Sequence, residues 1–167
     1  MILISIGANL PGDAGEPPVE TCRAAISFLC DISGLSFAAL SPWYRTGAIP
    51  AGNQPDYCNG IIRMQGEIDP ATLLAQLHEI ETRFGRKRSL PNAPRTLDLD
   101  IIDLNGLIRA TPAPILPHPR AHLRAFVLRP ILDVAPAWRH PTLRQNVVTL
   151  LAELPPQAIQ PWYQDAG

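Results

Sequence analysis

Residues 94–102 read PRTLDLDII, and this stretch is the most informative part of the chain. Its apolar residues alternate with Asp98 and Asp100, which is the period-two pattern of a β-strand with one buried face. Both carboxylates therefore project from the other face, with Cα atoms about 7 Å apart. This spacing allows them to share hard divalent cations such as Mg²⁺, and Arg95 could bind phosphate oxygens in a bidentate manner. The pattern predicts phosphoryl-type transfer from a magnesium nucleotide.

The composition predicts one globular domain over residues 1–167. Of the 167 residues, 46% are hydrophobic and 17% are charged, which is typical of a soluble globular chain. The formal net charge of −1 provides no basic field for nucleic acid, and no apolar run is long enough to span a membrane. The three cysteines form no C-x-x-C pair, so we expect reduced thiols and a cytoplasmic location. We also expect a monomer.

Outward from the aspartate strand, strand patterns and helix patterns alternate along the chain. Short apolar or alternating runs predict strands at residues 2–6, 35–44, 59–65 and 96–104. Apolar residues at helical spacing predict helices at residues 17–30, 70–84, 120–134 and 142–154. The second helix has the clearest start, because Asp69 is a good N-cap and Pro70 is tolerated in a first turn.

The order of these elements predicts an α+β fold. Strand-helix-strand-strand-helix-strand is the order of a ferredoxin-like antiparallel sheet flanked by helices. An Asn-Gly turn signal at residues 105–106 predicts an added hairpin to residues 107–108. The C-terminal helices follow, and the proline-rich end, about residues 155–167, is expected to be a loosely packed tail.

A basic loop, residues 86–95, lies between the second helix and the aspartate strand. By composition alone, its arginines could be a solvated surface run. Because the loop directly precedes Asp98 and Asp100, we expect instead a lid that closes on the phosphates of a bound nucleotide and excludes water.

Two further features are candidates for substrate contacts. His118 stands between two prolines, and we expect it to contact or orient phosphate, with a structural histidine as the alternative. Its spacing to His122 could suit zinc on a helix, but no third ligand of a suitable type is close in the sequence. Tyr57, Asn59 and Phe126 could hold a flat heterocycle through an aromatic wall and an amide edge. Taken singly, each of these three is also compatible with ordinary packing.

Several short segments stand in a characteristic order: SIGANL at 5–10, YRT at 44–46, QPDYCN at 54–59, Glu81, GR at 85–86, PRTLDLD at 94–100, PHP at 117–119 and RAFVL at 124–128. Together they resemble the 6-hydroxymethyl-7,8-dihydropterin pyrophosphokinase (HPPK) family of folate biosynthesis. The resemblance runs from about residue 2 to residue 136, and PRTLDLD is its most specific segment.

The resemblance implies transfer of a pyrophosphoryl group from ATP to the hydroxymethyl group of a dihydropterin, giving the pterin diphosphate and AMP, with two Mg²⁺ ions. It implies catalytic roles for Arg86, Arg95, Asp98 and Asp100, of which the two aspartates also bind metal. It implies ATP contacts for Glu81, Arg88, His118 and Arg124. It implies pterin contacts for Thr46, Gly47, Ile49, Tyr57, Asn59 and Phe126.

Two other functions fit part of this pattern. A binding module could hold a pterin or a nucleotide without catalysis, but simple binding requires no paired metal site such as Asp98 and Asp100. The chain also departs from the family pattern, because Asn92 and Ala93 stand where some members have a tryptophan. This altered lid leaves open a related pterin as the acceptor.

Overall fold

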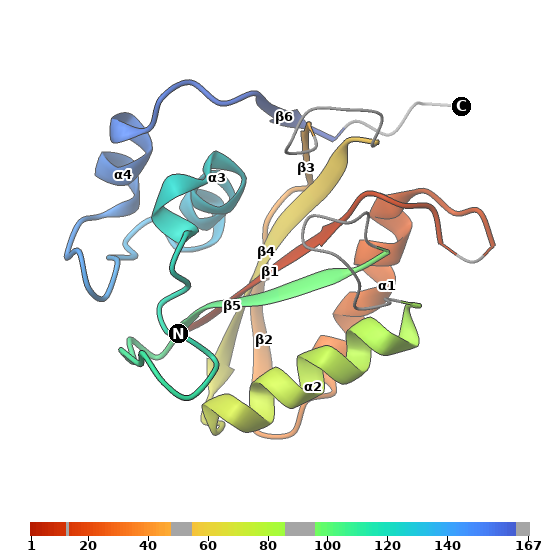
Figure 1. Cartoon of the computed structure of the whole chain (residues 1–167), viewed down its shortest axis with the longest axis horizontal. Coiled ribbons are helices and arrows are strands. Elements are labelled where there is room, and N and C mark those ends of the chain that lie inside the picture. The colour runs from red at the N-terminus through yellow and green to blue at the C-terminus, as the bar shows by residue number, and fades with distance from the viewer. Residues whose placement is uncertain (13, 48–54, 86–95, 163–167) are drawn as a thin grey trace.

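The computed structural model describes residues 1–12, 14–47, 55–85 and 96–162, arranged as in Figure 1. The strands are β1 (Ile2–Ala8), β2 (Leu35–Leu40), β3 (Tyr44–Thr46), β4 (Tyr57–Gly66), β5 (Asp98–Leu104) and β6 (Ile159–Pro161). The helices are α1 (Pro18–Cys30), α2 (Pro70–Arg83), α3 (Ala125–Val134) and α4 (Val147–Glu153), with a 3₁₀ turn, η1 (Ala121–Leu123), before α3. Every strand and helix predicted before residue 105 is confirmed, although the ends differ by a few residues and one strand is divided.

The six strands form one antiparallel sheet. Its order is β5-β1-β4-β3-β6, and β2 also pairs with β4. β1 pairs with β4 over its whole length, from Ile2 opposite Met64 to Ala8 opposite Cys58. The α+β class and the antiparallel sheet are therefore as predicted.

The strand predicted over residues 35–44 is divided into β2 and β3. Pro42 has no N–H to donate to a neighbouring strand. Ser41, at the break, stays attached to β4 because its N–H donates to the Ile61 carbonyl at 3.0 Å and its Oγ accepts the Ile61 N–H at 2.9 Å. β3 then pairs separately, with Thr46 opposite Tyr57.

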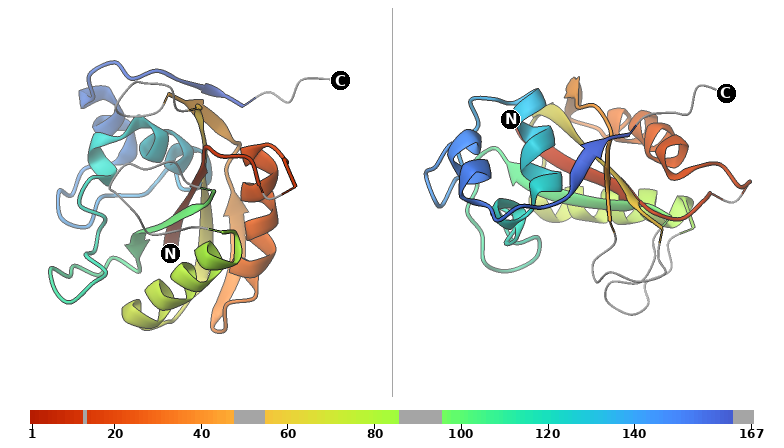
Figure 2. Two further views of the ribbon diagram at one scale, coloured as in Figure 1. Left: turned by 45° about the vertical axis from the view of Figure 1, so that its right-hand side comes forward. Right: turned by 90° about the horizontal axis from the view of Figure 1, so that it is seen from above.

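Two apolar cores lie on opposite faces of the sheet. In β1, Ile2, Ile4 and Ile6 belong to the core that α1 and α2 cover, whereas Leu3 belongs to the core that α3 and α4 cover. This division follows from the period-two alternation of side chains along a strand. Figure 2 shows the two pairs of helices on opposite sides of the sheet.

The prediction of an added hairpin after β5 is wrong. Residues 105–106 do turn with positive φ angles, 53° and 73°, as a type I′ turn requires. Residues 107–108 do not continue as a strand, however. Prolines recur in the loop at residues 111–119 and lack the N–H that a ladder needs. Arg109 and Leu116 form an isolated bridge across this loop.

The last two helices begin later than predicted. α3 begins at Ala125, because Arg124 before it has an extended backbone with φ −124° and ψ 114°. α4 begins at Val147, because Arg144 has a left-handed φ of 61°, which interrupts a right-handed helix. Asn146 provides the N-cap of α4.

Residues 155–162, the first part of the expected loose tail, are attached to the sheet. β6 lies within them and pairs with β3. The Trp162 N–H donates to the Trp43 carbonyl at 2.8 Å, and the Trp162 side chain packs against the core under α1 and α2. Among the described strands, β6 lies at the end of the sheet. Such an edge position tolerates the neighbouring prolines, because there the outer side of the strand needs no N–H donors.

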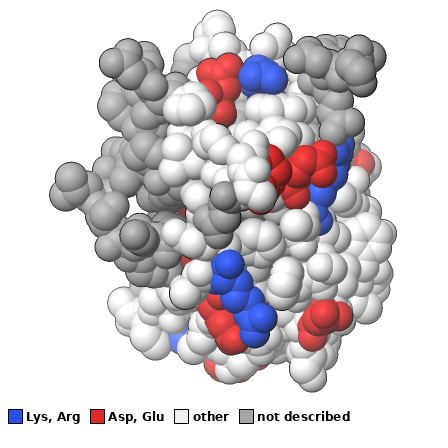
Figure 3. Space-filling model, turned by 90° about the vertical axis from the view of Figure 1, so that its right-hand side faces the viewer, with Lys and Arg blue, Asp and Glu red and all other residues white. Residues whose placement is uncertain are grey.

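The three cysteines all lie in the described residues and are free thiols, as expected, with Cys22 and Cys58 buried. On the face drawn in Figure 3, basic side chains lie beside acidic ones. The exposed pairs Arg23–Glu20 and Arg83–Glu79, with N···O distances of 2.6 Å and 3.4 Å, are examples of such neighbours. None of the helices in the described residues combines the length and apolar character that crossing a bilayer requires.

Candidate active site

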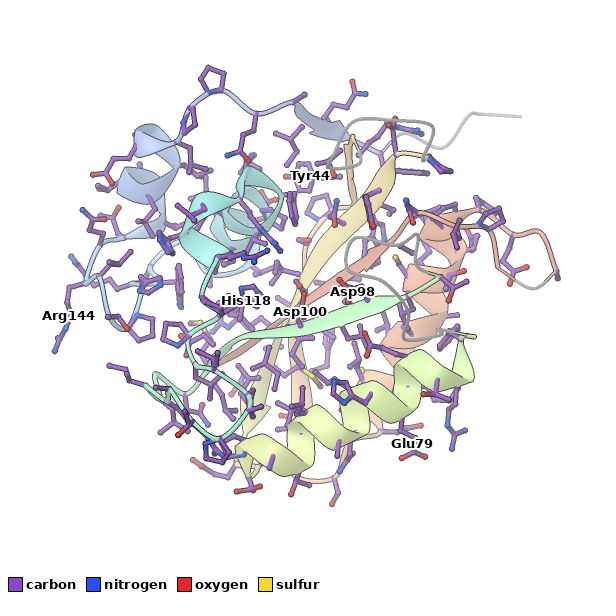
Figure 4. The ribbon with its side chains drawn as sticks, in the orientation of Figure 1. Tyr44, Glu79, Asp98, Asp100, His118 and Arg144 are labelled. Carbon is purple, nitrogen blue, oxygen red and sulfur yellow. The ribbon has the colours of Figure 1, made fainter. Side chains whose placement is uncertain are left out.

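The two aspartates of β5 face the side of the sheet that carries α3. Leu99 and Ile101, at 3% and 4% exposure, pack into the core under α1 and α2. Alternation along the strand therefore directs Asp98 and Asp100 to the opposite face. Figure 4 shows both aspartates on the side of β5 away from α2, with His118 beside the same strand.

The neighbouring strand leaves room above these carboxylates. β1 places Gly7 opposite Asp98 and Ser5 opposite Asp100. A Cβ atom on Gly7 would lie 3.0 Å from Oδ1 of Asn59, which is closer than ordinary van der Waals contact. Glycine at this position thus lets the Asn59 amide lie directly over β1.

These residues line a cavity of about 380 Å³ between the sheet and the η1–α3 segment. Its volume is within the usual range for small-molecule sites. Of the predicted catalytic and ATP-binding residues, the cavity includes Asp98, Asp100, His118 and Arg124. Of the predicted pterin-binding residues, it includes Thr46, Gly47, Tyr57, Asn59 and Phe126. The structure thus brings together residues that are distant in the sequence.

One part of the cavity is suited to a flat polar ring. Asn59 Nδ2 donates a hydrogen bond to Thr46 Oγ1 at 2.8 Å, and both residues are buried at 7% exposure. This bond holds the amide in one orientation. From α3, Phe126 adds an aromatic ring, and the Arg124 guanidinium carbon lies 5.4 Å from its centroid, a cation–π distance.

His118 provides a neutral hydrogen-bond donor in the lining of the cavity. Its backbone N–H donates to the Ile102 carbonyl at 2.9 Å, and its Nδ1 accepts the Arg120 N–H at 3.1 Å. Burial, with the positive charges of Arg124 and Arg120, lowers the pKa of His118 to about 4, although Asp98 acts in the other direction. The imidazole is therefore neutral at pH 7 and carries its proton on Nε2, which can donate to an anion.

Asp98 and Asp100 could hold a hard cation together with a substrate. Among the described residues, no group of three His, Cys, Asp or Glu side chains is arranged to bind a metal. Mg²⁺ fits two carboxylates without a third protein ligand, because in proteins it commonly retains water and binds substrate phosphates.

Glu81 lies outside the lining of the cavity. It belongs to α2, is 1% exposed, and its Oε2 accepts the Leu99 N–H at 3.0 Å. Because Leu99 stands between Asp98 and Asp100, this bond holds the aspartate strand from the opposite side of the sheet. The predicted contact of Glu81 with ATP stays a prediction.

Four predicted site residues lie outside the described residues: Ile49, Arg86, Arg88 and Arg95. The pterin contact of Ile49 stays a prediction, and so does the lid that the three arginines are expected to form. The cavity is defined here by the other predicted residues.

The cavity also includes residues to which the sequence analysis assigned no role: Ser5, Gly7, Ile102, Arg120, Leu123 and Val127. Ser5 and Gly7 do have a sequence signal, because these small residues alternate with isoleucines in β1. Arg120 and Leu123 have none, since they reach the cavity only through the way η1 and α3 pack beside the sheet.

Comparison with known proteins points to one family. Residues 3–136 match the family model described as 7,8-dihydro-6-hydroxymethylpterin-pyrophosphokinase (HPPK). The chain is 34% identical over 159 residues to the 2-amino-4-hydroxy-6-hydroxymethyldihydropteridine pyrophosphokinase of Synechocystis sp., covering 95% of this chain and 78% of the relative. It is 33% identical over 159 residues to the protein of the same name from Pseudomonas aeruginosa, covering 95% and 94%.

A third relative is a longer protein. The folic acid synthesis protein fol1 of Schizosaccharomyces pombe is 32% identical over 157 residues, which are 94% of this chain and 21% of the relative. The resemblance recognised in the sequence is therefore confirmed. The chain belongs to the HPPK family.

Proposed function

We propose that this chain transfers a pyrophosphoryl group from ATP to the hydroxymethyl group of 6-hydroxymethyl-7,8-dihydropterin, giving the pterin diphosphate and AMP. The observation that carries the proposal is one cavity lined by paired aspartates, by His118 and Arg124, and by the predicted pterin residues. The match to the HPPK family and the names of the relatives support the same reaction.

In this proposal, the pterin ring stacks on Phe126 beside Tyr57 and turns its polar edge toward Asn59. The hydrogen bond from Asn59 to Thr46 supports this arrangement, because it uses one amide N–H and leaves the other and Oδ1 as a donor/acceptor edge. Backbone contacts from Gly47 and Ile49 would complete the pocket.

The ATP phosphates lie near His118, Arg124 and the two aspartates. His118 donates from neutral Nε2, and Arg124 adds a fixed positive charge. Asp98 and Asp100 would hold Mg²⁺, and two ions are proposed. When bound, Mg²⁺ neutralises phosphate charge and lowers the pKa of an oxygen that it coordinates.

The reaction forms a bond between the hydroxymethyl oxygen and the β-phosphorus. The bond from that phosphorus to the α,β-bridging oxygen breaks, the oxygen leaves with AMP, and the hydroxyl proton is released to solvent. Phe126 and Asn59 orient the alcohol toward the phosphorus, while His118 and Arg124 orient the phosphates. Such alignment of two reactants is a major part of the rate increase in reactions of this type.

The finer features of fold and lid belong to the same proposal. The strand order β5-β1-β4-β2, with α1 and α2 on one face, supports a ferredoxin-like arrangement with C-terminal additions. Arg86, Arg88 and Arg95 would close over the phosphates, with Arg86 and Arg95 stabilising charge on the departing oxygen. The single domain, the monomeric state and the cytoplasmic location stay predictions.

Asp98→Ala and Asp100→Ala test the proposal directly. Each variant removes a metal ligand but leaves the buried face of β5 intact, so turnover should fall by at least about 10³-fold while Tm stays close to that of the wild type. Turnover is measured as AMP formed from ATP, with and without the hydroxymethyl dihydropterin. Asp31→Asn, at the exposed end of α1, is the matched control.

Three results would contradict parts of the proposal. Near wild-type turnover in either aspartate variant would contradict the metal site. Pterin binding without AMP formation by the wild type would indicate a binding module. Faster turnover with another pterin alcohol would indicate a different acceptor.

A further inference from the structure

The C-terminal strap, defined here as residues 155–162, joins the two walls of the cavity. It leaves α4, passes over α3 and ends as β6 beside β3, as Figure 1 shows. The strap lies beyond residues 3–136, which match the family model. The family model therefore does not cover the contacts of the strap.

Gln157 in the strap bonds to the chain on both sides of Arg124. Its Oε1 accepts the Ala125 N–H at 2.9 Å, and its Nε2 donates to the Leu123 carbonyl at 3.0 Å. The Ala125 N–H is the first N–H of α3, and no helical carbonyl is available to accept it. The Arg124 side chain does not cap the helix either. Gln157 therefore provides the cap from a distant part of the sequence.

The segment to which Gln157 is hydrogen-bonded, residues 123–125, holds two cavity residues in place. Arg124 lies between the two bonded backbone groups, and Phe126 follows the capped residue Ala125 directly. Arg124 has an extended backbone between η1 and α3. Its N–H donates to the Ala121 carbonyl at 3.4 Å, and its carbonyl accepts the Val127 and Leu128 N–H groups at 3.1 Å and 3.0 Å. The two bonds from Gln157 add a restraint from the strap on both sides of this residue.

The other end of the strap holds the opposite wall. In β6, Ile159 pairs with Thr46, the residue whose Oγ accepts the Asn59 amide. Beyond β6, the Trp162 ring lies 3.9 Å from the guanidinium carbon of Arg45, a cation–π contact next to Thr46. One continuous segment thus contacts both the α3 wall and the β3 wall.

We propose that Gln157 is a positioning residue, which holds Arg124 and Phe126 in the orientation that binds ATP and the pterin. This inference rests on the proposed function, because it assumes that both residues contact the substrates. It assigns no chemical step to Gln157, which acts only through the backbone at residues 123–125.

Gln157→Ala removes both bonds, and Gln160→Ala is the matched control. Gln160 is exposed and lies in β6, in the same strap, where its backbone pairs with that of Arg45 in β3. We expect Gln157→Ala to raise KM for ATP or for the pterin by about fivefold, the effect of losing about one net hydrogen bond, while kcat changes less. Gln160→Ala should match the wild type in both constants.

Gln157→Glu separates the two bonds. A carboxylate still accepts the Ala125 N–H but cannot donate to the Leu123 carbonyl, so KM should lie between the values for the wild type and Gln157→Ala. A residue that only stabilised the fold would lower Tm in both variants and leave KM unchanged. Far-UV circular dichroism establishes that each variant is folded at the assay temperature.

The inference is overturned if both KM values of Gln157→Ala and Gln157→Glu stay within about twofold of those of Gln160→Ala. It is equally overturned if the Glu variant, with one bond kept, is no closer to the wild type than the Ala variant. Wild-type assays distinguish these outcomes from failure of the proposed function, in which the wild type itself would form no pterin-dependent AMP.

Discussion

Glu81 offers a quantitative test of how the aspartate strand is held. Its carboxylate is buried and accepts the Leu99 N–H at 3.0 Å. In Glu81→Ala, this N–H loses its acceptor in a place closed to water, which costs about 2 kcal/mol. The buried methylene that is lost adds about 1 kcal/mol. The free energy of unfolding should fall by about 3 kcal/mol, or about 9 °C in Tm for a domain of this size.

Glu81→Gln separates the hydrogen bond from the charge. The amide oxygen can still accept the Leu99 N–H, so the loss should be about 1 kcal/mol. Glu79 on the same helix provides the control, because its pair with Arg83, at 3.4 Å, is largely exposed. Glu79→Ala should change the free energy of unfolding by less than about 0.5 kcal/mol. Urea denaturation followed by circular dichroism measures all three variants.

Two results would refute this reasoning. One is a Glu81→Ala variant within about 0.5 kcal/mol of the wild type, and the other is an equal loss in the Ala and Gln variants. The same variants test the expected ATP contact. If Glu81→Gln raises KM for ATP while its stability falls by no more than the expected loss of about 1 kcal/mol, Glu81 contacts ATP directly. If KM for ATP is unchanged, Glu81 makes no direct contact with ATP.

Three further predictions concern the remaining contacts. Gly7→Ala should raise KM for the pterin several-fold at nearly constant Tm, because the new Cβ would lie 3.0 Å from Asn59 Oδ1; an unchanged KM would contradict this. Tyr44→Phe removes a hydroxyl that donates to Asp133 and should lower the free energy of unfolding, measured by urea denaturation, by about 1 kcal/mol. An unchanged free energy of unfolding would show that this hydrogen bond contributes nothing to stability. Burial lowers the pKa of His140 from 6.5, so the unfolded chain binds this proton more readily than the folded protein does. The contribution of His140 to stability should therefore be constant above about pH 6.5 and decrease below it. Tm of His140→Asn should decrease less than that of the wild type between pH 7 and pH 5, and equal decreases would refute this.

The helices and strands that could be predicted from the sequence are those defined by residues close together in the chain. α2 is an example, because Asp69 accepts the Thr72 N–H at 3.1 Å as the predicted N-cap. The prediction of a hairpin after β5 failed because a hairpin depends on more than its turn. An Asn-Gly turn is a local feature, but a partner strand also needs N–H donors along its length, and the prolines of residues 111–119 lack them.

The candidate site shows the same division. Alternation along β5 was enough to predict that Asp98 and Asp100 share a face, and the resemblance named several of the other residues that line the cavity, but not all of them. It did not predict that Glu81 would lie behind the strand, because the side of the sheet that α2 covers depends on the assembled core.

The sequence by itself determined that two carboxylates stand side by side on a strand, because the pleat of a β-strand is a property of the backbone. Only the tertiary structure decided which residues lie around these carboxylates and how those residues are held. Gly7 lies opposite Asp98, and Gln157 caps the helix that begins beside Arg124. Such contacts join residues far apart in the chain, so their partners are selected by the packing of the whole domain and not by any local pattern.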